Sequence, residues 1–300
     1  MYLLFVVSRN EGALLRQNLE HHFAWGFDHA LVADNESTDE TPEVLMGFAG
    51  AVTHLRLARF ADRYVALGEL LSRAEARHGE ARWVAVSDTD EFWWAPIAGV
   101  GTLLASVPPA VLALNAGQKL FLPTDADATS GPIMCRRRHR TAREDSPLHS
   151  SYVRGKSFYR AAWLRGHTLD DNHRSPSIVP ASWRRTGAPL VHHYMVDGED
   201  GFVRKVQDYP RHYPALAARP PGEPGSAAVQ TAAVGFRGFK RAWWELFQAG
   251  GEAALRAYYR DTYRLDARAL QRYLASGDLV EDRAFAEHTA SRLGLGARAP

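Results

Sequence analysis

Two aspartates separated by one residue, Asp88 and Asp90, follow an apolar segment typical of a buried strand, residues 83–87. In an extended backbone, residues two apart point to the same side, so this spacing predicts two carboxylates aimed at one spot. Hard oxygen ligands of this kind suit Mg²⁺ or Mn²⁺, which take further ligands from a substrate diphosphate. The metal would neutralise charge that develops on the leaving diphosphate. A solvated turn is the alternative, but three aromatic residues, 92–94, follow almost at once and disfavour it. Glu91 would point to the opposite face, which favours a structural role.

A second polar group, residues 34–39, follows another short apolar segment. An acidic residue at the end of such a strand, here Asp34, can accept hydrogen bonds from the base or ribose of a nucleotide. Turns are rich in Asp, Asn, Ser and Thr for purely local reasons, so an ordinary turn remains an alternative. The hypothesis of a nucleotide contact at Asp34 therefore depends on whether Asp34 lies at the same edge of the sheet as Asp88.

The elements that must position these residues alternate between short apolar segments and segments of helical periodicity. The predicted strands are residues 2–7, 29–33, 52–57, 83–87 and 111–114. The predicted helices in this part are residues 12–25, a helix that starts at Thr41, and residues 62–78. The alternation indicates βαβ units, hence a doubly wound α/β fold with a mainly parallel sheet. Ligands bind at the carboxyl edge of such sheets, where Asp34 and Asp88 would meet.

The remaining chain predicts a division into domains. Residues 123–189 are rich in Arg, His, Asp, Pro and Ser, which is typical of the irregular rim of a site. A Pro- and Gly-rich segment, residues 219–228, is the clearest linker. We therefore expect an α/β domain over residues 1–218, which would hold the site, and a helical region over residues 229–300.

Composition excludes several classes of protein. The 300 residues are 46% hydrophobic and 23% charged, the balance of an ordinary globular protein. The single cysteine, Cys135, excludes an internal disulfide and a cysteine zinc cluster within one chain. The net charge of +2 gives no indication of a nucleic-acid partner, and we expect none. No apolar stretch is long enough to span a bilayer, so the expected location is the cytoplasm. A basic run, residues 136–140, leaves open a solvated loop, steering of an anionic substrate or a peripheral membrane contact.

Several sequence blocks carry a family resemblance. They are Arg9-Asn10-Glu11, Glu20-His21-His22, Gly26-Phe27-Asp28-His29, the run from Asp34 to Thr41, Trp83 to Phe92, Gly155-Lys156-Ser157, and His192-His193-Tyr194 followed by Phe202 and Lys205. In this order they resemble family 2 glycosyltransferases, in particular the branch related to family 92. The resemblance covers roughly the first two-thirds of the chain and leaves out the C-terminal helical region.

The resemblance implies a glycosyltransferase A-type fold, which is a nucleotide-binding α/β sandwich. The donor would be a nucleotide-diphosphate sugar, with a UDP-sugar favoured, and the acceptor a carbohydrate or another molecule with a hydroxyl group. The implied site residues are Asp34 and Asn35 near the base or ribose, Arg9 and Glu11 in the nucleotide pocket, Asp88 and Asp90 on Mn²⁺ or Mg²⁺, His193 as a third metal ligand or diphosphate contact, and Lys156 on a phosphate. A core histidine and a surface lysine remain the alternatives for His193 and Lys156.

Transfer with inversion also needs a general base that takes the proton from the acceptor hydroxyl. The resemblance places this base well after the metal motif, where Asp170 and Asp171 fall at a suitable distance. Glu144 and Asp145 compete for the role, and the histidines at positions 167 and 173 are further alternatives.

Two other functions stay open on the sequence. A nucleotidyltransferase also uses metal-bound carboxylates on an α/β sheet, but it would be expected to carry a Gly-rich basic loop after the first strand. This chain has Ser8-Arg9-Asn10-Glu11 there instead. A protein that binds a sugar nucleotide without turning it over is the other alternative.

Overall fold

The computed structural model describes residues 1–59, 62–127, 130–142, 156–169, 184–195, 197–212 and 236–294. The chain forms two compact units. The first comprises Met1–Gln118, Arg154–His193 and Ala284–Pro300, and the second comprises Lys119–Val153 and Tyr194–Arg283. The predicted linker at 219–228 lies outside the described residues, so the predicted domain boundaries stay a prediction.

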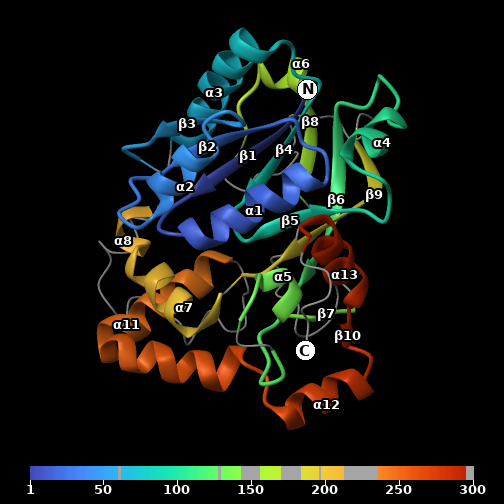
Figure 1. Ribbon diagram of the computed structural model, residues 1–300. Helices are drawn as coiled ribbons and strands as arrows, with labels where there is room; N and C mark the ends of the chain where they lie inside the picture. The colour runs from blue at the N-terminus through green and yellow to red at the C-terminus, as the bar shows by residue number, and fades with distance from the viewer. Residues whose placement is uncertain are drawn as a thin grey trace. The chain divides into compact units, whose positions relative to one another are not determined.

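The first unit is built on an eight-stranded sheet with the order β3-β2-β1-β4-β8-β6-β9-β5. Its first half consists of β3 (Val52–Arg56), β2 (His29–Asp34), β1 (Tyr2–Ser8) and β4 (Trp83–Asp88), and each neighbouring pair is parallel (Figure 1). The predicted α/β fold class, with a parallel central sheet and C-terminal helices, is confirmed.

The parallel half forms because its inner strands are apolar along their whole length. Every residue of β2 is buried, as are all but the first of β1 and all but the last of β4. Such strands are stable only when helices cover both faces. The connecting helices are α1 (Gly12–Ala24), α2 (Thr41–Gly47) and α3 (Arg63–His78). The apolar side of α3, with Leu67, Leu70 and Leu71, joins the core formed with Phe5, Leu31 and Val86.

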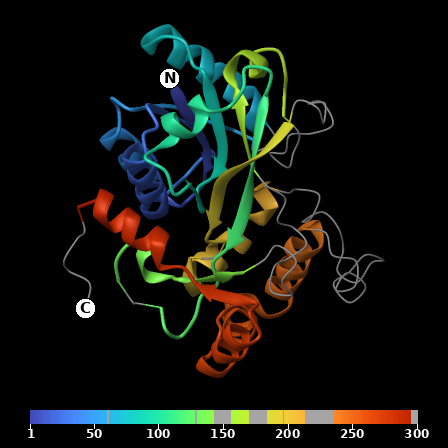
Figure 2. The ribbon, with the colours of Figure 1, turned by 90° about the vertical axis from the view of Figure 1, so that its right-hand side faces the viewer.

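Beyond β4 the sheet continues with antiparallel pairs, which the sequence pattern does not predict. The further strands are β5 (Glu91–Trp94), β6 (Ala113–Leu120), β8 (Ser157–Arg160) and β9 (Arg184–His193). Strand β8 pairs antiparallel with both β4 and β6, and β5 pairs antiparallel with β9. Figure 2 shows β6 in green and β9 in yellow alongside one another. Strand β5 escapes sequence reasoning because it starts directly after a tight turn and is only 4 residues long.

Shorter helices complete the first unit: α4 (Val100–Ala105), α6 (Ala161–Leu164) and, except for its first residue, α13 (Arg283–Arg292). Helix α13 returns to the first unit from the end of the chain. Its Phe285 packs edge-on against His21 and His192, and Arg292 donates to the carbonyl oxygens of Ala24 and Ala98. The last described helix is therefore part of the α/β unit, unlike the helices just before it.

The second unit is mainly helical. Its elements are α5 (Ile133–Arg136), β7 (His139–Thr141), α7 (Gly198–Gln207), α8 (Tyr209–His212), α11 (Phe236–Tyr258), the π-helix η3 (Tyr259–Tyr263), α12 (Ala267–Ala275) and β10 (Leu279–Glu281). Strands β7 and β10 pair antiparallel. Trp243 of α11 packs edge-on against Phe202 of α7. Among the described helices, none combines the length and the apolar character needed to cross a bilayer.

Candidate functional site

The carboxyl ends of three parallel strands bring the predicted polar groups to one edge of the sheet. Ser8 at the end of β1 is in register with Asp34 at the end of β2, and Val7 is in register with Asp88 at the end of β4. The two acidic groups therefore end neighbouring strands on either side of β1. This edge is where open α/β sheets bind ligands.

The turn after β2 is folded tightly back on itself. Asp34 is buried, and its Oδ1 accepts a hydrogen bond from the backbone N–H of Ser37 at 2.9 Å. The backbone N–H of Asn35 donates to the carbonyl of Ser8 at 2.9 Å, and Glu36 adopts a φ of 55°. A non-glycine residue with positive φ needs such surroundings to hold it. Much of the polarity of this segment is therefore used to form the turn.

Arg9 holds the same turn from the other side. Its buried guanidinium donates through Nη1 to the carbonyl oxygen of Asn35, and to that of Glu36 at 3.3 Å. A charged donor with two backbone acceptors fixes the geometry of the loop. Arg9 therefore stabilises the turn after β2, a role that the sequence does not reveal. Its predicted place in the nucleotide pocket stays a prediction.

Asp39 joins the starts of two helices. One carboxylate oxygen accepts from the N–H of Gly12 at 2.9 Å, and the other accepts from the N–H and the hydroxyl of Thr41 at 3.0 and 2.6 Å. A carboxylate at a helix start satisfies N–H groups that have no partner within the helix. A Cβ on Gly12 would lie 2.8 Å from the backbone nitrogen of Thr41, so only glycine fits there. Glu11 immediately precedes α1, and its side chain does not cap this helix.

The turn that holds the predicted metal pair differs from the expected extended backbone. Strand β4 ends at Asp88, Thr89 and Asp90 form a turn, and β5 begins at Glu91. The expectation that Asp88 and Asp90 lie on one side of a strand is therefore wrong, because Asp90 is part of a turn and not of the strand. Asn18 of α1 fixes the turn by donating to the carbonyls of Thr89 and Glu91 at 3.0 and 2.8 Å.

The two aspartates of this turn have different surroundings. The side chain of Asp88 is 39% exposed, whereas that of Asp90 is 6% exposed and lies 3.4 Å from Nε2 of His193. His193 ends β9 in register with Glu91, and its Nδ1 lies 2.9 Å from Nε2 of Gln118. The structure thus brings Asp90 and His193 together, as predicted for two members of one site.

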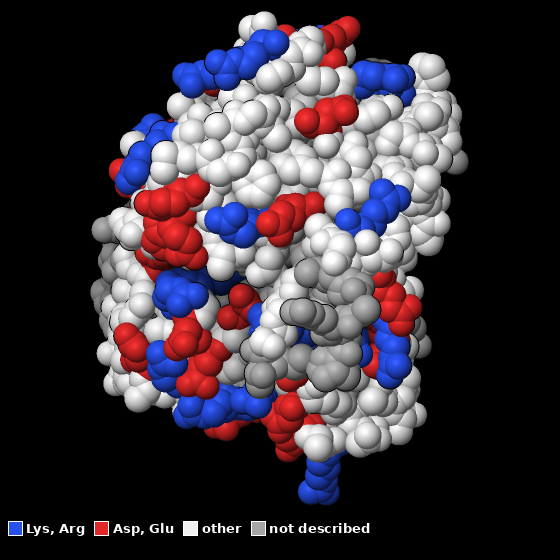
Figure 3. Space-filling model, in the orientation of Figure 1, with Lys and Arg blue, Asp and Glu red and all other residues white. Residues whose placement is uncertain are grey.

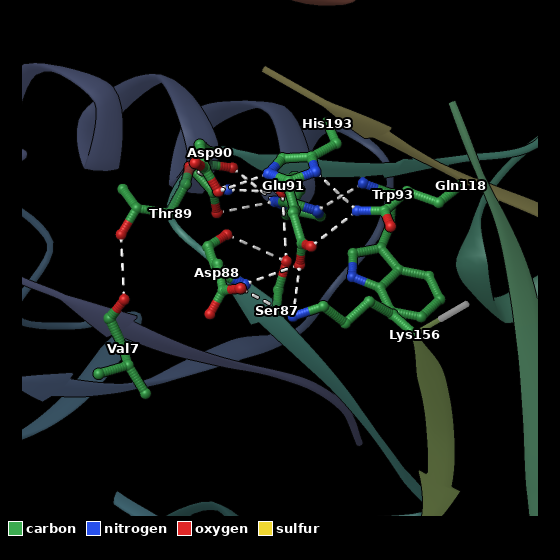
Figure 4. A network of polar contacts seen from close by, with 12 residues as sticks. Val7, Ser87, Asp88, Thr89, Asp90, Glu91, Trp93, Gln118, Lys156 and His193 are labelled. Atoms are coloured by element: carbon green, nitrogen blue, oxygen red, sulfur yellow. Dashed lines mark hydrogen bonds and ion pairs between the residues drawn. The ribbon is translucent and has the colours of Figure 1, made fainter. Parts of the chain in front are cut away.

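Glu91 is the centre of the polar network shown in Figure 4. Its carboxylate accepts from the N–H of Asp88 at 2.9 Å and from Nε2 of Gln118 at 3.0 Å. It also forms an ion pair with Lys156 at 3.0 Å. Sequence reasoning gives Glu91 a structural role without seeing that it connects the other site residues. Gln118 lies near the end of β6 and carries no sequence signal.

Lys156 precedes β8 and is buried beside β4. Its Nζ lies 2.8 Å from Oδ2 of Asp88 and 3.0 Å from Oε2 of Glu91. Burial opposes the charge of this ammonium, but Asp88 and Glu91 outweigh it and raise the pKa of Lys156. Burial also raises the pKa of the Glu91 carboxyl, which Lys156 opposes and Asp88 reinforces. The ammonium therefore keeps its proton, and the description of Lys156 as a surface residue does not hold.

The donor set allows a divalent cation that shares its ligands with a substrate. Within the described residues, no group of three or more His, Cys, Asp or Glu side chains is arranged to hold a metal. Asp88 offers a half-exposed carboxylate at the sheet edge, and Asp90 lies two positions further. Mg²⁺-like ions are commonly held by one or two carboxylates with phosphate oxygens and water completing the shell. These two carboxylates suit part of the shell of such an ion.

Other predicted residues fall elsewhere. Asp170 and Asp171, the predicted general base, lie outside the described residues, as do the competing carboxylates at 144 and 145 and the histidine at 173. His167 stacks on Trp163 at 4.4 Å between ring centroids, so its ring is part of local packing. His192, the neighbour of His193, is buried against Phe285 in the core.

The basic run of the second unit is largely neutralised by carboxylates. Three ion pairs join Arg136 to Asp197 at 2.9 Å, Arg137 to Asp127 at 3.3 Å and Arg140 to Asp282 at 2.5 Å. These arginines are buried or half-buried, so the interpretation of the run as a solvated loop is wrong. On the face shown in Figure 3, basic and acidic side chains are interspersed. A peripheral membrane contact through this run stays a prediction.

A depression of about 690 Å³ lies along β3 and the end of α3, with His54, Arg73 and Arg77 in its lining. It contains none of the predicted site residues, and His54 precedes the carboxyl end of its strand. The carboxyl edge that holds Asp34 and Asp88 is therefore a separate feature.

Comparisons with known proteins give similarity only at the level of structure. No protein-family profile matches the sequence, and no curated protein matches it. A mannosyltransferase from Pyrobaculum calidifontis, solved with GDP-mannose and Mn²⁺, is 17% identical with a TM-score of 0.43, over 99% of this chain and 88% of that one. S. aureus TarS 1–349 with UDP-GlcNAc is 11% identical with a TM-score of 0.40, over 87% of this chain and 92% of that one. Glucosyl-3-phosphoglycerate synthase from Mycobacterium tuberculosis, solved with Mn²⁺ and UDP, is 16% identical with a TM-score of 0.27, over 39% of this chain and 44% of that one.

All three neighbours are glycosyltransferases of the A-type fold. The identities and TM-scores are low, so this likeness concerns the fold and does not decide the activity of this chain.

Proposed function

We propose that this protein is a glycosyltransferase that uses a nucleotide-diphosphate sugar. The observation that carries the proposal is the meeting of two acidic strand ends, Asp34 and Asp88, at one carboxyl edge beside a buried ammonium, Lys156. The edge offers acceptors for a nucleoside and charges for a diphosphate within one surface. The sequence blocks that resemble family 2 glycosyltransferases support the same function.

The nucleoside would lie over the turn after β2. Hydrogen bonds hold Arg9 and the Asp34 turn together, so this part would need little ordering on binding. A preorganised binding surface loses less entropy on binding. Asp34, Asn35 and Glu11 are the residues we assign to base and ribose recognition.

The diphosphate would lie between the turns that follow β2 and β4. Asp88 would hold a divalent cation, with Asp90 and His193 next to it, and Mn²⁺ or Mg²⁺ would supply Lewis-acid stabilisation of the leaving diphosphate. Lys156 would donate to a phosphate oxygen from the inner side of the site. Two side chains hold the turn by hydrogen bonds to the backbone. Asn18 donates to the carbonyl of Thr89 at 3.0 Å, and Oγ1 of Thr89 donates to the carbonyl of Val7 at 3.1 Å.

The acceptor hydroxyl would attack the anomeric carbon from the side opposite the diphosphate, which gives inversion. The attacking oxygen needs a base, and we assign this role to Asp170 or Asp171 on the basis of the family resemblance. Exchange of each residue for Asn would identify the one whose loss reduces the rate at saturating acceptor.

The direct test is release of nucleoside diphosphate from a panel of UDP- and GDP-sugars in the presence of Mn²⁺. We expect turnover with at least one donor, and a loss of roughly 100- to 1,000-fold in kcat for Asp88→Asn, the range seen when a charge-stabilising group is removed. Glu43→Gln is the matched control, because Glu43 is an exposed carboxylate on α2 of the same unit.

The products separate the proposal from its alternatives. A nucleotidyltransferase would release pyrophosphate from a nucleoside triphosphate rather than a nucleoside diphosphate from a sugar donor. A binding protein would be stabilised against heat by UDP or GDP yet release neither from any donor. Either result would refute the proposed transfer reaction.

A further inference from the structure

The ammonium of Lys156 is shared between two carboxylates at the end of β4. Nζ lies 2.8 Å from Asp88 and 3.0 Å from Glu91, and the side chain is 8% exposed. A buried charge is stable only when opposite charge compensates it. Both carboxylates therefore act as its counter-ions.

These two counter-ions are not equivalent. Glu91 is 1% exposed and is held by the N–H of Asp88 and by Gln118, so it cannot leave its place without breaking these bonds. Asp88 is 39% exposed and faces the edge where the diphosphate is proposed to bind. The ammonium thus has one fixed partner and one partner that is open to exchange.

The charge of the cluster changes with its occupants. When ionised, Lys156, Asp88, Glu91 and the adjacent Asp90 together carry two net negative charges. A diphosphate bound alone would meet this negative charge, and a divalent cation bound alone would meet the ammonium beside Asp88. When both bind, the cation offsets the charge of the diphosphate, and the diphosphate takes over the contact with the ammonium. The cation and the diphosphate should therefore bind better together than singly.

We propose that Lys156 is a resident counter-cation of Asp88 that a divalent metal must displace, and that Glu91 is the positioning residue that retains the ammonium in the site. This inference rests on the proposed function, because it takes Asp88 as a metal ligand. On binding of metal and diphosphate, the ammonium keeps its contact with Glu91 and exchanges Asp88 for a diphosphate oxygen. The exchange involves no covalent step.

The test measures Mn²⁺ binding to the full chain without nucleotide, by the electron paramagnetic resonance signal of free Mn²⁺. Lys156→Met should bind Mn²⁺ about tenfold more tightly than the native protein, because a cation beside Asp88 is removed. Glu91→Gln should bind it more weakly, because the ammonium then depends on Asp88 for compensation. Both variants should unfold at lower temperature, so the opposite shifts in Mn²⁺ affinity distinguish competition from simple structural damage.

Matched controls remove the same charges elsewhere in the first unit. Arg77→Met and Glu43→Gln change exposed residues of α3 and α2 and should leave the Mn²⁺ affinity as in the native protein. The double variant Glu91→Gln/Lys156→Met should bind Mn²⁺ like Lys156→Met. Lys156→Gln, which can still donate to both carboxylates, should give the same direction if the Met variant does not fold.

Shifts in the same direction for Lys156→Met and Glu91→Gln, or affinities equal to those of the controls, would overturn the proposal. An absence of Mn²⁺ binding in Lys156→Met and Lys156→Gln would also overturn it. Opposite shifts in a protein that releases no nucleoside diphosphate from any donor would leave the cation exchange standing and refute the glycosyltransferase function. Turnover with Mn²⁺ affinities that do not change in the variants would support the glycosyltransferase function and refute the cation exchange.

Discussion

The two polar turns at the carboxyl edge of the sheet use their side chains in different ways. In the turn after β2, Arg9, Asp34 and Asp39 bond mainly to backbone groups, and these bonds shape the loop. In the turn after β4, charged side chains bond mainly to one another, with Glu91 and Lys156 at the centre. The first turn is held by hydrogen bonds to its own backbone, while the second is a set of compensated charges with one exposed member. The proposed function accordingly assigns nucleoside recognition to the first turn and ion exchange to the second.

The largest expected effect is on the stability of the charged turn. Glu91→Ala leaves Lys156 buried with less compensation and should lower the free energy of unfolding by about 3–5 kcal/mol. The double variant Glu91→Gln/Lys156→Met removes both charges and should lose much less. Urea denaturation of both variants checks this. Equal losses of stability would mean that the compensation of Lys156 by Glu91 does not stabilise the turn after β4, and the two turns would then not differ in this way.

Acidification should also affect the second turn more than the first. His22 accepts a hydrogen bond at Nε2 from the N–H of Trp93 at 3.0 Å, and His21 lies 2.8 Å from the Trp93 carbonyl, both beneath β5. Burial is the main cause that lowers the pKa of His21 from 6.5 to about 4, and burial likewise lowers the pKa of His22. A lowered pKa means that the unfolded chain takes up the proton first. The stability is thus complete above pH 6.5 and is lost as the pH falls towards 4.

The loss from His21 alone should reach roughly 3 kcal/mol near pH 4, at 1.36 kcal/mol for each unit of pKa. Unfolding measured between pH 7.5 and pH 4 checks the total, and a His21→Asn variant should show a flatter dependence. Amide exchange gives the local readout, because the N–H of Trp93 should lose protection before that of Ser37. Simultaneous loss at both amides would show that the two turns do not differ in this respect.

Arg9 tests whether the first turn is held mainly by its own side chains. Arg9→Met removes a charged donor from the carbonyls of Asn35 and Glu36 and should cost about 1.5–3 kcal/mol of stability. Nucleotide binding should weaken as well, because the turn it would contact loses its support. Binding that weakens at unchanged stability would mean that Arg9 contacts the ligand instead of supporting the turn.

The smallest expected effect is at Asp39. Asp39→Ala removes the acceptor of the N–H groups at the starts of α1 and α2 and should destabilise the protein by about 0.5–2 kcal/mol, as for the loss of a capping side chain. Asp39→Asn, which retains an acceptor oxygen, should recover part of the loss. Thermal unfolding of both variants provides the measurement. The Mn²⁺ affinity should stay unchanged in both variants. A changed affinity would show that the turn after β2 influences metal binding at the turn after β4, which contradicts the proposed separation of the two turns.

Sequence reasoning locates the parallel half of the sheet well, because those strands are continuous apolar runs with helices between them. The predicted strand at 83–87 corresponds to β4, which extends one residue further, to Asp88. The predicted helix at 62–78 corresponds to α3, which begins one residue later, at Arg63. It does not predict β5 and β9, since one follows a tight turn and the other lies in an Arg-rich segment. The candidate residues Asp34 and Asp88 are found because strand ends are visible in the sequence. Gln118 is not found, because a single amide within a strand has no local pattern.

By itself, the sequence determined which residues end the strands of the parallel half, and therefore that Asp34 and Asp88 share an edge of the sheet. Apolar runs and helical spacing are local properties, and the parallel arrangement follows from general rules of connection. Only the tertiary structure decided that Asp90 turns inward to His193 and that Lys156 lies on Asp88 and Glu91. These contacts join residues separated by 103, 68 and 65 positions in the sequence, on strands whose antiparallel pairing is set by packing. Compensation of buried charge depends on such distant partners, so it cannot be inferred from the spacing of two aspartates.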